Sequence, residues 1–316
     1  MTDVHVHLAA LPTAENGCLL SRRMQRSLLC KAIVFSQKLS RHSPEAANQA
    51  YIERLKRELS RSQAVTRAVV LALDGVYDSS GRLDEARTDF LVANDYLFSV
   101  VAAEPRFLAG ASVNPQRRDA LAELERCAAR GAVLIKVLPN VQGFDPAERR
   151  YLPFYKRMAE LRLALLSHVG YEFSLFAAAQ SFGEPERLIP ALDQGVTVVA
   201  AHGCSTGKFV SGLYRAAFEL ARRYPNFFID TSALTLPNRV RALFELRRSP
   251  ELFDRLIFGT DYPLPCLSYP CLGNLDVRSY LRARALPSRF DRQKEVLEAL
   301  GVPAGKDFMS LVNRSA

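Results

Sequence analysis

Short runs of apolar residues alternate along the chain with longer amphipathic stretches. Most of these runs are continuously apolar, which is typical of parallel strands buried on both faces of a sheet. Eight strands are predicted, at residues 3–8, 68–73, 107–113, 133–138, 163–167, 196–201, 227–229 and 256–258. Helices are predicted at residues 44–62, 85–103, 117–130, 146–162, 185–194, 208–224, 238–249 and 289–300.

The order of these elements predicts the fold. Eight strands, each followed by helical material, are typical of the α/β class and of a (β/α)8 TIM barrel. A chain of 316 residues can form one such barrel as a single domain. Residues 9–46 follow the first strand without fitting the repeat, so they are expected to form an insertion over the mouth of the barrel. This insertion is either a lid or an inert loop with a short helix.

Composition and charge narrow the range of partners. With 48% hydrophobic and 24% charged residues, the chain is an ordinary globular protein that can bury a large core. The net charge of +9 raises the question of nucleic-acid binding, but the arginines are scattered, and the densest group, Arg22, Arg23 and Arg26, has no interleaved aromatic residues. This pattern favours solvated helix faces and no nucleic-acid partner. A basic surface would still attract an anionic small-molecule substrate, and homo-oligomer formation stays open.

The cysteines and the apolar stretches bear on the cellular compartment. Six cysteines occur without a C-x-x-C pair, and the first residues form a predicted strand rather than a signal peptide. The longest apolar stretch, residues 161–179, is interrupted by Arg162, His168 and Glu172, which argues against a membrane span. The sequence therefore predicts a cytoplasmic protein with reduced cysteines and no membrane partner.

Four of the five histidines lie in or directly after the predicted strands. His5 and His7 belong to the first strand, and His168 and His202 follow the fifth and sixth. Asp261 follows the eighth strand, within the sequence Phe-Gly-Thr-Asp-Tyr-Pro. Imidazole and carboxylate groups together form the donor set of a catalytic zinc or similar divalent ion.

The spacing of these residues predicts that they meet. In a strand, side chains two positions apart point to the same side, so His5 and His7 can reach one ion. His168 and His202 are separated by one β-α unit of about 30 residues, and His202 and Asp261 by two. In a barrel of this class, all strands end at the same face, where active sites are built. The sequence therefore predicts a metal site at that face.

Other polar residues near strand ends are also candidates. Lys136 lies near the end of the fourth strand, an unfavourable position for a lysine without a charged or metal partner, so we expect it to point into the barrel. Asp74 and Asp230 end the second and seventh strands, and each either binds substrate, supports a metal ligand or caps a helix. His42 lies in a polar stretch and is expected at the surface.

The series Asp3-x-His5-x-His7, Lys136, His168, His202 and Asp261 resembles the amidohydrolase superfamily of metal-dependent barrels. The sequences Lys-Val-Leu-Pro at 136–139, Gln-Gly-Phe at 142–144 and Phe-Gly-Thr-Asp-Tyr-Pro at 258–263 resemble its amidohydrolase-related branch. That branch contains hydrolases, lactonases and decarboxylases of the aminocarboxymuconate-semialdehyde type. The early first strand and the long segment 9–46 depart from the pattern of the family.

The resemblance implies a role for each of these residues. His5, His7, His168 and Asp261 would hold one divalent ion, expected to be Zn²⁺, although manganese and iron share these ligands. Asp261 would also act as general base, and His202 would polarise a substrate carbonyl or transfer a proton. In a two-metal form, Lys136 would carry a bridging carbamate, and His168 and His202 would hold the second ion.

A metal-dependent hydrolase that cleaves an amide, ester or lactone bond of a small molecule with metal-activated water is the leading interpretation. The alternative is a non-oxidative decarboxylase, a lyase that acts on an unsaturated or aromatic carboxylate with the same site. An arginine at the barrel mouth would favour the decarboxylase, but the sequence does not identify one. The intact ligand set disfavours an inactive barrel, and Lys136 disfavours a nuclease. The substrate-binding residues are not predicted, because selectivity lies in loops.

Overall fold

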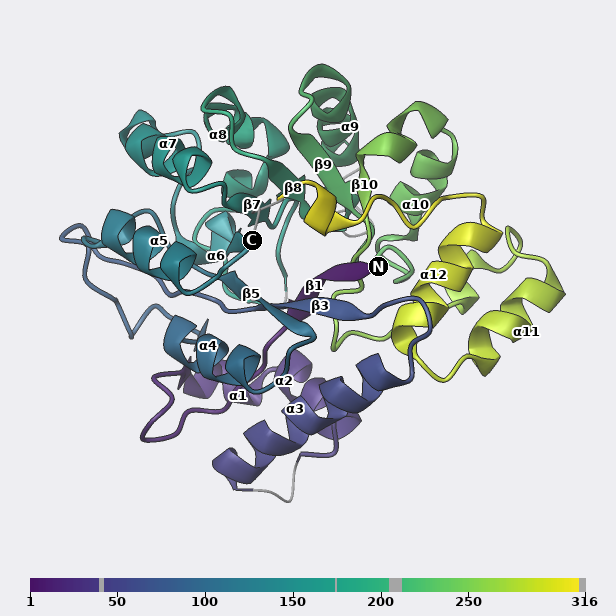
Figure 1. Ribbon diagram of the computed structural model, residues 1–316, viewed down its shortest axis with the longest axis horizontal. Coiled ribbons are helices and arrows are strands. Elements are labelled where there is room, and N and C mark those ends of the chain that lie inside the picture. The colour runs from purple at the N-terminus through teal and green to yellow at the C-terminus, as the bar shows by residue number, and fades with distance from the viewer. Residues whose placement is uncertain (40–42, 174, 205–211, 313–316) are drawn as a thin grey trace.

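Eight parallel strands form the centre of the molecule, with helices around them (Figure 1). The computed structural model describes all residues except 40–42, 174, 205–211 and 313–316. The strands are, in sheet order, β1 (Thr2–His7), β3 (Arg67–Leu71), β5 (Phe107–Ala111), β6 (Leu134–Val137), β7 (Ala164–Ser167), β8 (Val198–Ala200), β9 (Phe227–Asp230) and β10 (Leu256–Ile257). The order around the sheet follows the order along the chain, as the sequence predicted.

Hydrogen bonds between the first and last strands close the sheet into a barrel. The Val4 amide donates to the Phe258 carbonyl at 3.0 Å, and the His7 amide donates to the Tyr262 carbonyl at 2.8 Å. In return, the Asp261 amide donates to the His5 carbonyl at 2.9 Å. The segment after β10 therefore continues the strand pairing and forms the seam of the barrel with β1. This closure confirms the predicted (β/α)8 TIM barrel.

The carboxylate of Asp3 strengthens this seam. It accepts hydrogen bonds from the Thr260 hydroxyl at 2.6 Å, the Thr260 amide at 3.2 Å and the His5 amide at 2.9 Å. Burial nevertheless raises the pKa of Asp3 to about 7, because these three donors only partly offset the loss of hydration. The residue fixes β1 against the segment that carries Asp261.

Most predicted helices are present, although they are shorter at their ends. The structure has α3 (Pro44–Ser60), α5 (Ala120–Ala129), α7 (Leu152–Glu160), α8 (Ile189–Asp193), α9 (Leu213–Arg223), α10 (Val240–Arg247) and α12 (Arg289–Ala299). The predicted start of the helix at 208–224 lies outside the described residues. Short 3-10 helices are η1 (Arg149–Tyr151), η2 (Gln180–Gly183), η3 (Pro185–Leu188), η4 (Ala201–Cys204), η5 (Pro250–Arg255), η6 (Tyr269–Cys271) and η7 (Phe308–Ser310).

One helix was predicted with the wrong start, and another was missed. The helix predicted at 85–103 is only α4 (Asn94–Ala102), because the preceding β4 (Phe90–Leu91) instead pairs antiparallel with β2 (Leu19–Leu20). The sequence also missed α11 (Val277–Ala285), which packs beside α12. The only buried residue of α11 is Ala283, so the helix has no apolar stripe to reveal it. A further short helix, α6 (Pro139–Gln142), follows β6.

The segment after β1 contains β2 and two short helices, α1 (Arg22–Arg26) and α2 (Leu28–Ser36). The predicted segment 9–46 overlaps α3 at residues 44–46. The Ser43 hydroxyl accepts a hydrogen bond from the Ala46 amide at 3.3 Å, and Pro44 occupies the first turn, so α3 already begins there. Figure 1 shows α1 and α2 in purple, in the same region as α3.

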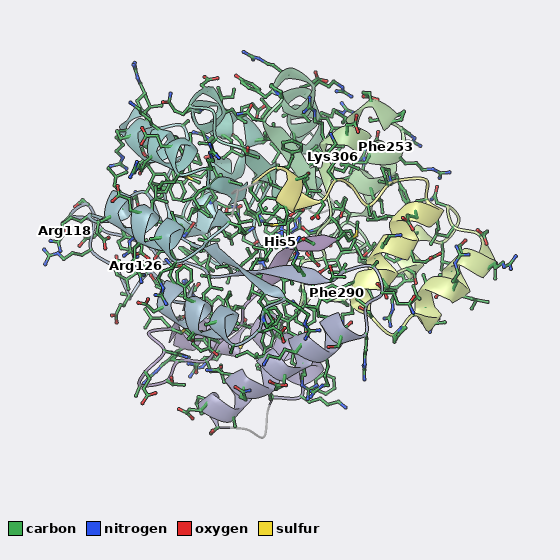
Figure 2. The ribbon with its side chains drawn as sticks, viewed as in Figure 1. His5, Arg118, Arg126, Phe253, Phe290 and Lys306 are labelled. Atoms are coloured by element: carbon green, nitrogen blue, oxygen red, sulfur yellow. The ribbon has the colours of Figure 1, made fainter. Side chains whose placement is uncertain are left out.

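The outer surface carries most of the arginines, and carboxylates accompany many of them. Figure 2 shows His5 near the centre of the barrel, whereas Arg118 and Arg126 lie at its periphery. Arg126 pairs with Asp95 at 2.5 Å and with Glu123 at 2.7 Å. Within the described part of the chain, no helix is long and apolar enough to cross a membrane.

Candidate metal centre

Three potential ligand atoms lie close together at the carboxyl end of the barrel. The Nε2 atoms of His5 and His7 are 3.2 Å apart. Oδ1 of Asp261 lies 3.1 Å from Nε2 of His7 and 3.6 Å from Nε2 of His5. Ligands at about 2.0–2.2 Å from one tetrahedral ion lie roughly 3.4 Å from each other. The three atoms therefore have the mutual spacing of ligands around a single ion.

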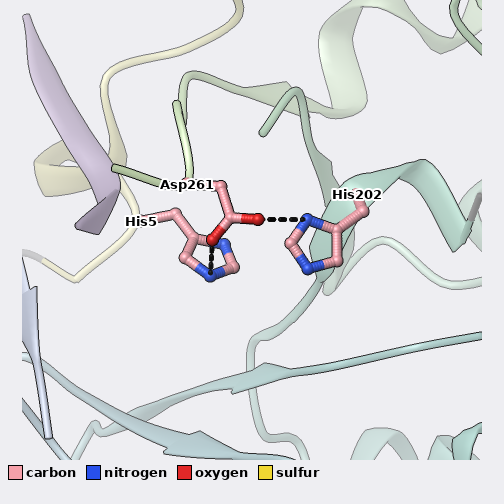
Figure 3. Close-up of side chains that lie close together, drawn as sticks. All are labelled: His5, His202 and Asp261. Carbon is pink, nitrogen blue, oxygen red and sulfur yellow. Dashed lines mark ion pairs between the residues drawn. The ribbon is translucent and has the colours of Figure 1, made fainter. Parts of the chain in front are cut away.

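His202 approaches the other carboxylate oxygen of Asp261. Its Nδ1 lies 3.6 Å from Oδ2, so the two oxygens of Asp261 face different histidines (Figure 3). His5, His202 and Asp261 can each offer one ligand atom so that all three atoms lie within 4.8 Å of one another. His202 follows β8 with a φ of 60°, and Asp261 has a φ of 64°. Both residues thus adopt the left-handed conformation, a strain that is concentrated at functional sites.

His168 is buried beside His202. The centroids of the His168 and His202 rings are 5.2 Å apart. No ion pair among the described residues joins His168 to Asp261, and the carboxylate of Glu172 lies 3.7 Å from its Nε2. That nitrogen is buried and has no hydrogen-bond partner in the described part of the chain. A buried, unbonded ring nitrogen is unfavourable and therefore fits a site that receives a ligand from outside the chain.

Asp230, at the end of β9, orients the imidazole of His5. Its Oδ2 lies 2.7 Å from Nδ1 of His5, which leaves Nε2 directed at His7 and Asp261. Its Oδ1 accepts from the His202 amide at 2.7 Å and from the Ser232 hydroxyl at 2.5 Å. A carboxylate bound to the far nitrogen of a histidine is the usual support of a metal-binding imidazole. Of the roles that the sequence left open for Asp230, the geometry favours this support.

Lys136 points into the barrel from β6. Its side chain is buried, and Nζ lies 3.4 Å from Nε2 of His5. Burial lowers the pKa of Lys136 to about 8, although the charges of Asp230 and Asp261 oppose this shift. Near pH 8, Lys136 is therefore a neutral amine in a fraction of the protein molecules. The neutral amine is the form that reacts with carbon dioxide to give a carbamate.

His5, His168 and His202 are neutral at physiological pH. Burial lowers the pKa of His5 to about 4, and the charge of Lys136 adds to this effect. Burial also holds the pKa values of His168 and His202 well below the usual range, with a further contribution from Arg239. Neutral imidazoles are the form that binds a metal ion.

Asp261 is ionised under the same conditions. Burial alone would raise its pKa, but electrostatic interactions with His5, the hydrogen bond and electrostatic interaction with His7, and the charge of Arg239 together hold it well below its usual range. The centre therefore combines the neutral imidazoles of His5, His168 and His202 with one carboxylate. Imidazole and carboxylate donors together fit a divalent ion such as zinc.

A cavity of about 190 Å³ opens onto these residues. Its polar lining includes His7, Lys136, His168, His202, Asp261, Glu172 and Arg239. The sequence did not single out Arg239, which precedes α10 in the connection that follows β9. The sequence could have pointed to Arg239 only through its position in such a connection, because these connections form the active-site face of a barrel. The chain has 42 lysines and arginines, and this signal alone does not choose among them.

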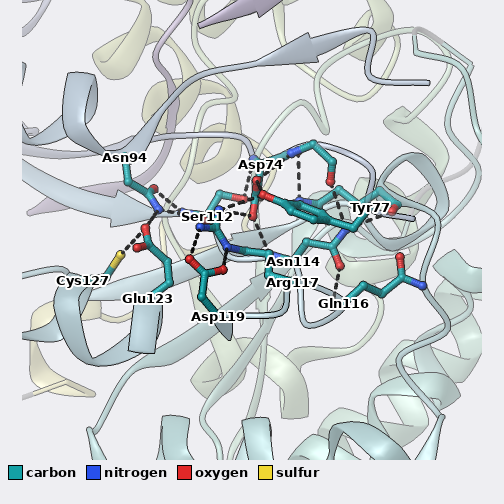
Figure 4. A network of polar contacts seen from close by, with 12 residues as sticks. Asp74, Tyr77, Asn94, Ser112, Asn114, Gln116, Arg117, Asp119, Glu123 and Cys127 are labelled. Carbon is teal, nitrogen blue, oxygen red and sulfur yellow. Dashed lines mark hydrogen bonds and ion pairs between the residues drawn. The ribbon is translucent and has the colours of Figure 1, made fainter. Parts of the chain in front are cut away.

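Asp74 belongs to a separate polar network, shown in Figure 4. Its carboxylate accepts from the amides of Gly75 and Asn114 and from the Tyr77 hydroxyl, each at 2.8 Å, and it pairs with Arg117 at 3.4 Å. These contacts tie together the connections after β3 and β5. Asp74 does not line the cavity, so the geometry favours a structural role. His42 lies outside the described residues.

Replacing Asp230 by asparagine is expected to weaken metal binding by about 10–100-fold, because it removes the charge that orients His5. Metal affinity is measured by titration of the metal-free protein with zinc against a competing chelator. Asp74→Asn is the matched control, since it neutralises another buried carboxylate that ends a strand. It is expected to lower stability but leave the zinc affinity unchanged. Equal zinc affinities in the wild-type protein and Asp230→Asn would contradict the assigned role.

Solved structures with the same architecture cover nearly the whole chain. An uncharacterised TIM-barrel protein from Bordetella bronchiseptica is 18% identical over 95% of this chain and 97% of that one, with a TM-score of 0.60. A probable 2-pyrone-4,6-dicarboxylic acid hydrolase from Acinetobacter baumannii is 14% identical, with coverages of 95% and 98% and a TM-score of 0.52. A 2,6-dihydroxybenzoate decarboxylase is 16% identical, with the same coverages and TM-score. At these identities the likeness establishes the fold alone.

Sequence comparison gives the family. No curated protein sequence matches the chain significantly. The family model described as amidohydrolase, however, matches residues 2–290, a range that runs from β1 into α12 and contains every candidate ligand. Members of this family are enzymes that act on small molecules and usually bind a divalent metal. The chain belongs to the amidohydrolase family.

Proposed function

We propose that the protein is a metal-dependent hydrolase that cleaves an amide, ester or lactone bond of a small molecule. The observation that carries this proposal is the convergence of Nε2 of His5, Nε2 of His7 and Oδ1 of Asp261, which lie 3.1–3.6 Å apart. These three residues, with His168 as the fourth, would hold one divalent ion, for which zinc is the best candidate. When bound, such an ion lowers the pKa of a water molecule from about 15.7 to near 7.

Asp261 is placed to move the proton of the attacking water. Oδ1 faces His5 and His7, whereas Oδ2 faces His202. Because the pKa of Asp261 is held low, the carboxylate is ionised and accepts a proton at neutral pH. It then returns that proton to the leaving nitrogen or oxygen, which is the general base and general acid role in one residue.

The hydrogen bonds of Ser232 support a proton on Nδ1 of His202. The single hydroxyl hydrogen of Ser232 points to Oδ1 of Asp230 at 2.5 Å. Its oxygen therefore accepts from Nδ1 of His202 at 2.8 Å. With the proton on Nδ1, Nε2 of His202 presents a lone pair and acts in proton transfer. Of the two roles that the resemblance implies for His202, we propose this one.

A decarboxylase is the second candidate, and Arg239 is the observation that favours it. Arg239 lines the same cavity as His7 and Asp261, and its charge lowers the pKa values of His202 and Asp261. A cation in this position suits a substrate carboxylate. The solved structures that share this fold include both a hydrolase and a decarboxylase by name. Identification of the reaction product therefore distinguishes the hydrolase from the decarboxylase.

Metal analysis followed by a divided substrate screen tests the proposal. We expect about one equivalent of metal per chain, complete loss of activity on removal with a chelator, and recovery with zinc. A stoichiometry near two would instead support the two-metal form with a carbamate on Lys136. One half of the screen measures release of carbon dioxide and the other measures ester, amide or lactone hydrolysis. Protein that binds no divalent metal after reconstitution would overturn the proposal.

The same proposal includes the domain organisation, the cellular compartment and the charge of the substrate. The chain acts as one domain over residues 1–316, and the segment that begins at residue 9 serves as a lid over the active-site face. Its support is that Leu11, Leu20 and Met24 of this segment line the cavity. We place the enzyme in the cytoplasm, and we propose an anionic substrate because of the net charge of +9.

A further inference from the structure

Helix α2 is rich in apolar residues, yet none of its residues is buried. Leu28 and Phe35 on one side are 85% and 84% exposed. On the other side, Leu29, Cys30, Ile33 and Val34 line the cavity above the metal centre. These four positions share one helical face, and the cavity accounts for their partial exposure. An apolar face that borders an internal space is the usual wall of a ligand site.

The rest of this part of the cavity is apolar as well. Opposite and beside α2, its walls are formed by Leu11, Leu20, Met24, Leu39, Phe90 and Leu264. Two polar residues also line it, and both use their polar groups elsewhere. The Asn48 side chain accepts from the Leu11 amide at 2.7 Å and donates to the Leu11 carbonyl at 2.9 Å. The Tyr51 hydroxyl donates to the His7 carbonyl at 2.6 Å.

The cavity therefore has two chemically different regions. His7, Lys136 and Asp261 line one, and the inner face of α2 lines the other. Its volume is about 190 Å³, somewhat larger than the cavity of about 150 Å³ that holds one benzene molecule in another protein. A small polar substrate at the metal centre would leave the apolar walls in contact with water, whereas a substrate with an apolar group would cover them.

We propose that the substrate carries an apolar group, a short alkyl chain or an aromatic ring, that packs against Leu29, Cys30, Ile33 and Val34 while its reacting group lies at His5, His7 and Asp261. This inference rests on the proposed function, because it places the reacting group at the metal centre. It assigns α2 as the element that selects the substrate. Each methylene buried there is expected to tighten binding about fourfold, on the basis of about 0.8 kcal/mol per methylene.

Calorimetry with straight-chain carboxylates tests this selection. The dissociation constants of acetate, butanoate, hexanoate and octanoate are measured with the zinc-loaded enzyme and again after chelation. In both forms we expect affinity to rise about fourfold per methylene until the cavity is filled, and then to level off. A series with no dependence on chain length would overturn the inference. The carboxylate group is expected to contribute to affinity in the zinc-loaded form. Comparison of the zinc-loaded and chelated forms therefore separates the contribution of the polar region to affinity from that of the apolar region.

Two substitutions on opposite faces of α2 localise the effect. Ile33→Glu places a charge in the apolar wall and is expected to abolish the chain-length dependence, whereas Ala32→Glu adds the same charge on the exposed side and leaves the dependence intact. If Ile33→Glu disturbs folding, Ile33→Phe provides the second test. The larger ring narrows the cavity, so affinity is expected to level off at a shorter chain. An identical series in Ile33→Phe and the wild-type protein would count against the inference.

Cys30 offers a readout that is independent of both metal and activity. Its thiol is free and lines the cavity beside Ile33. Saturating octanoate is expected to slow alkylation of Cys30, followed by mass spectrometry of its peptide, at least tenfold, while acetate has no such effect. Protection by octanoate without hydrolysis of any ester, amide or lactone would support the inference and contradict the proposed function. Hydrolysis of short acetyl esters, without protection of Cys30 and without chain-length dependence, would support the proposed function and contradict the inference.

Discussion

The Asp261→Asn variant is expected to lose turnover by about 10²–10⁴-fold. Asparagine keeps the shape of the side chain and can still direct an oxygen at His5 and His7, but it has neither the negative charge nor the ability to accept a proton. The variant therefore loses the proposed base and one anionic ligand together, and its zinc content is expected to fall as well. Steady-state kinetics and metal analysis of the same preparation measure both effects.

Asp291→Asn is the control for this prediction. Asp291 is a buried carboxylate that accepts from the Ser62 hydroxyl at 2.6 Å and from the Gln63 amide at 2.9 Å. Its replacement is expected to reduce stability without changing kcat per folded molecule or the bound metal. If Asp261→Asn keeps wild-type turnover on a verified substrate, the reaction does not take place at this centre.

The His202→Ala variant is expected to keep its metal and to lose about 10²-fold or more in kcat. This result follows from the single-ion form, in which His202 transfers a proton but does not complete the ligand set. In the two-metal form, the same substitution would remove one of two ions and halve the metal content. Metal content and kcat, measured together, therefore distinguish the two forms.

His168→Ala is the companion variant. Its ring lies beside His202 and its Nε2 is the buried, unbonded nitrogen of the centre. We expect this variant to lose metal in both forms, because His168 is a ligand in each. If His168→Ala binds zinc as tightly as the wild-type protein while His202→Ala does not, the two histidines have exchanged the roles proposed for them.

The barrel was predictable because burial governs its strands. A strand covered on both faces must be continuously apolar, and all eight predicted runs coincide with strands of the barrel. The formation of elements outside the barrel depends on other interactions. β4 forms only because β2 lies beside it, and α11 has almost no buried face. Neither cause leaves a periodic pattern in the local sequence.

The site was predictable to the extent that it depends on strand geometry. His5 and His7 share one side of β1, and Asp261 follows the strand that closes on β1, so their contact follows from the fold. The position of His168 next to His202 depends on where the backbone turns away from β7 and from β8. The spacing of the two histidines in the sequence does not define these turning points. Arg239 belongs to a connection between elements, and only tertiary packing brings it to the cavity.

The seam of the barrel also determines when the site can exist during synthesis of the protein. Asp3 and Thr260, which are bonded across the seam, are 257 positions apart in the chain. His5 and His7 are therefore synthesised long before Asp261. The proposed metal ion would tie these distant parts together, much as a cross-link closes a long loop. A nascent chain that ends just before Asp261 therefore already contains the four histidines of the centre but lacks the carboxylate that completes the proposed site.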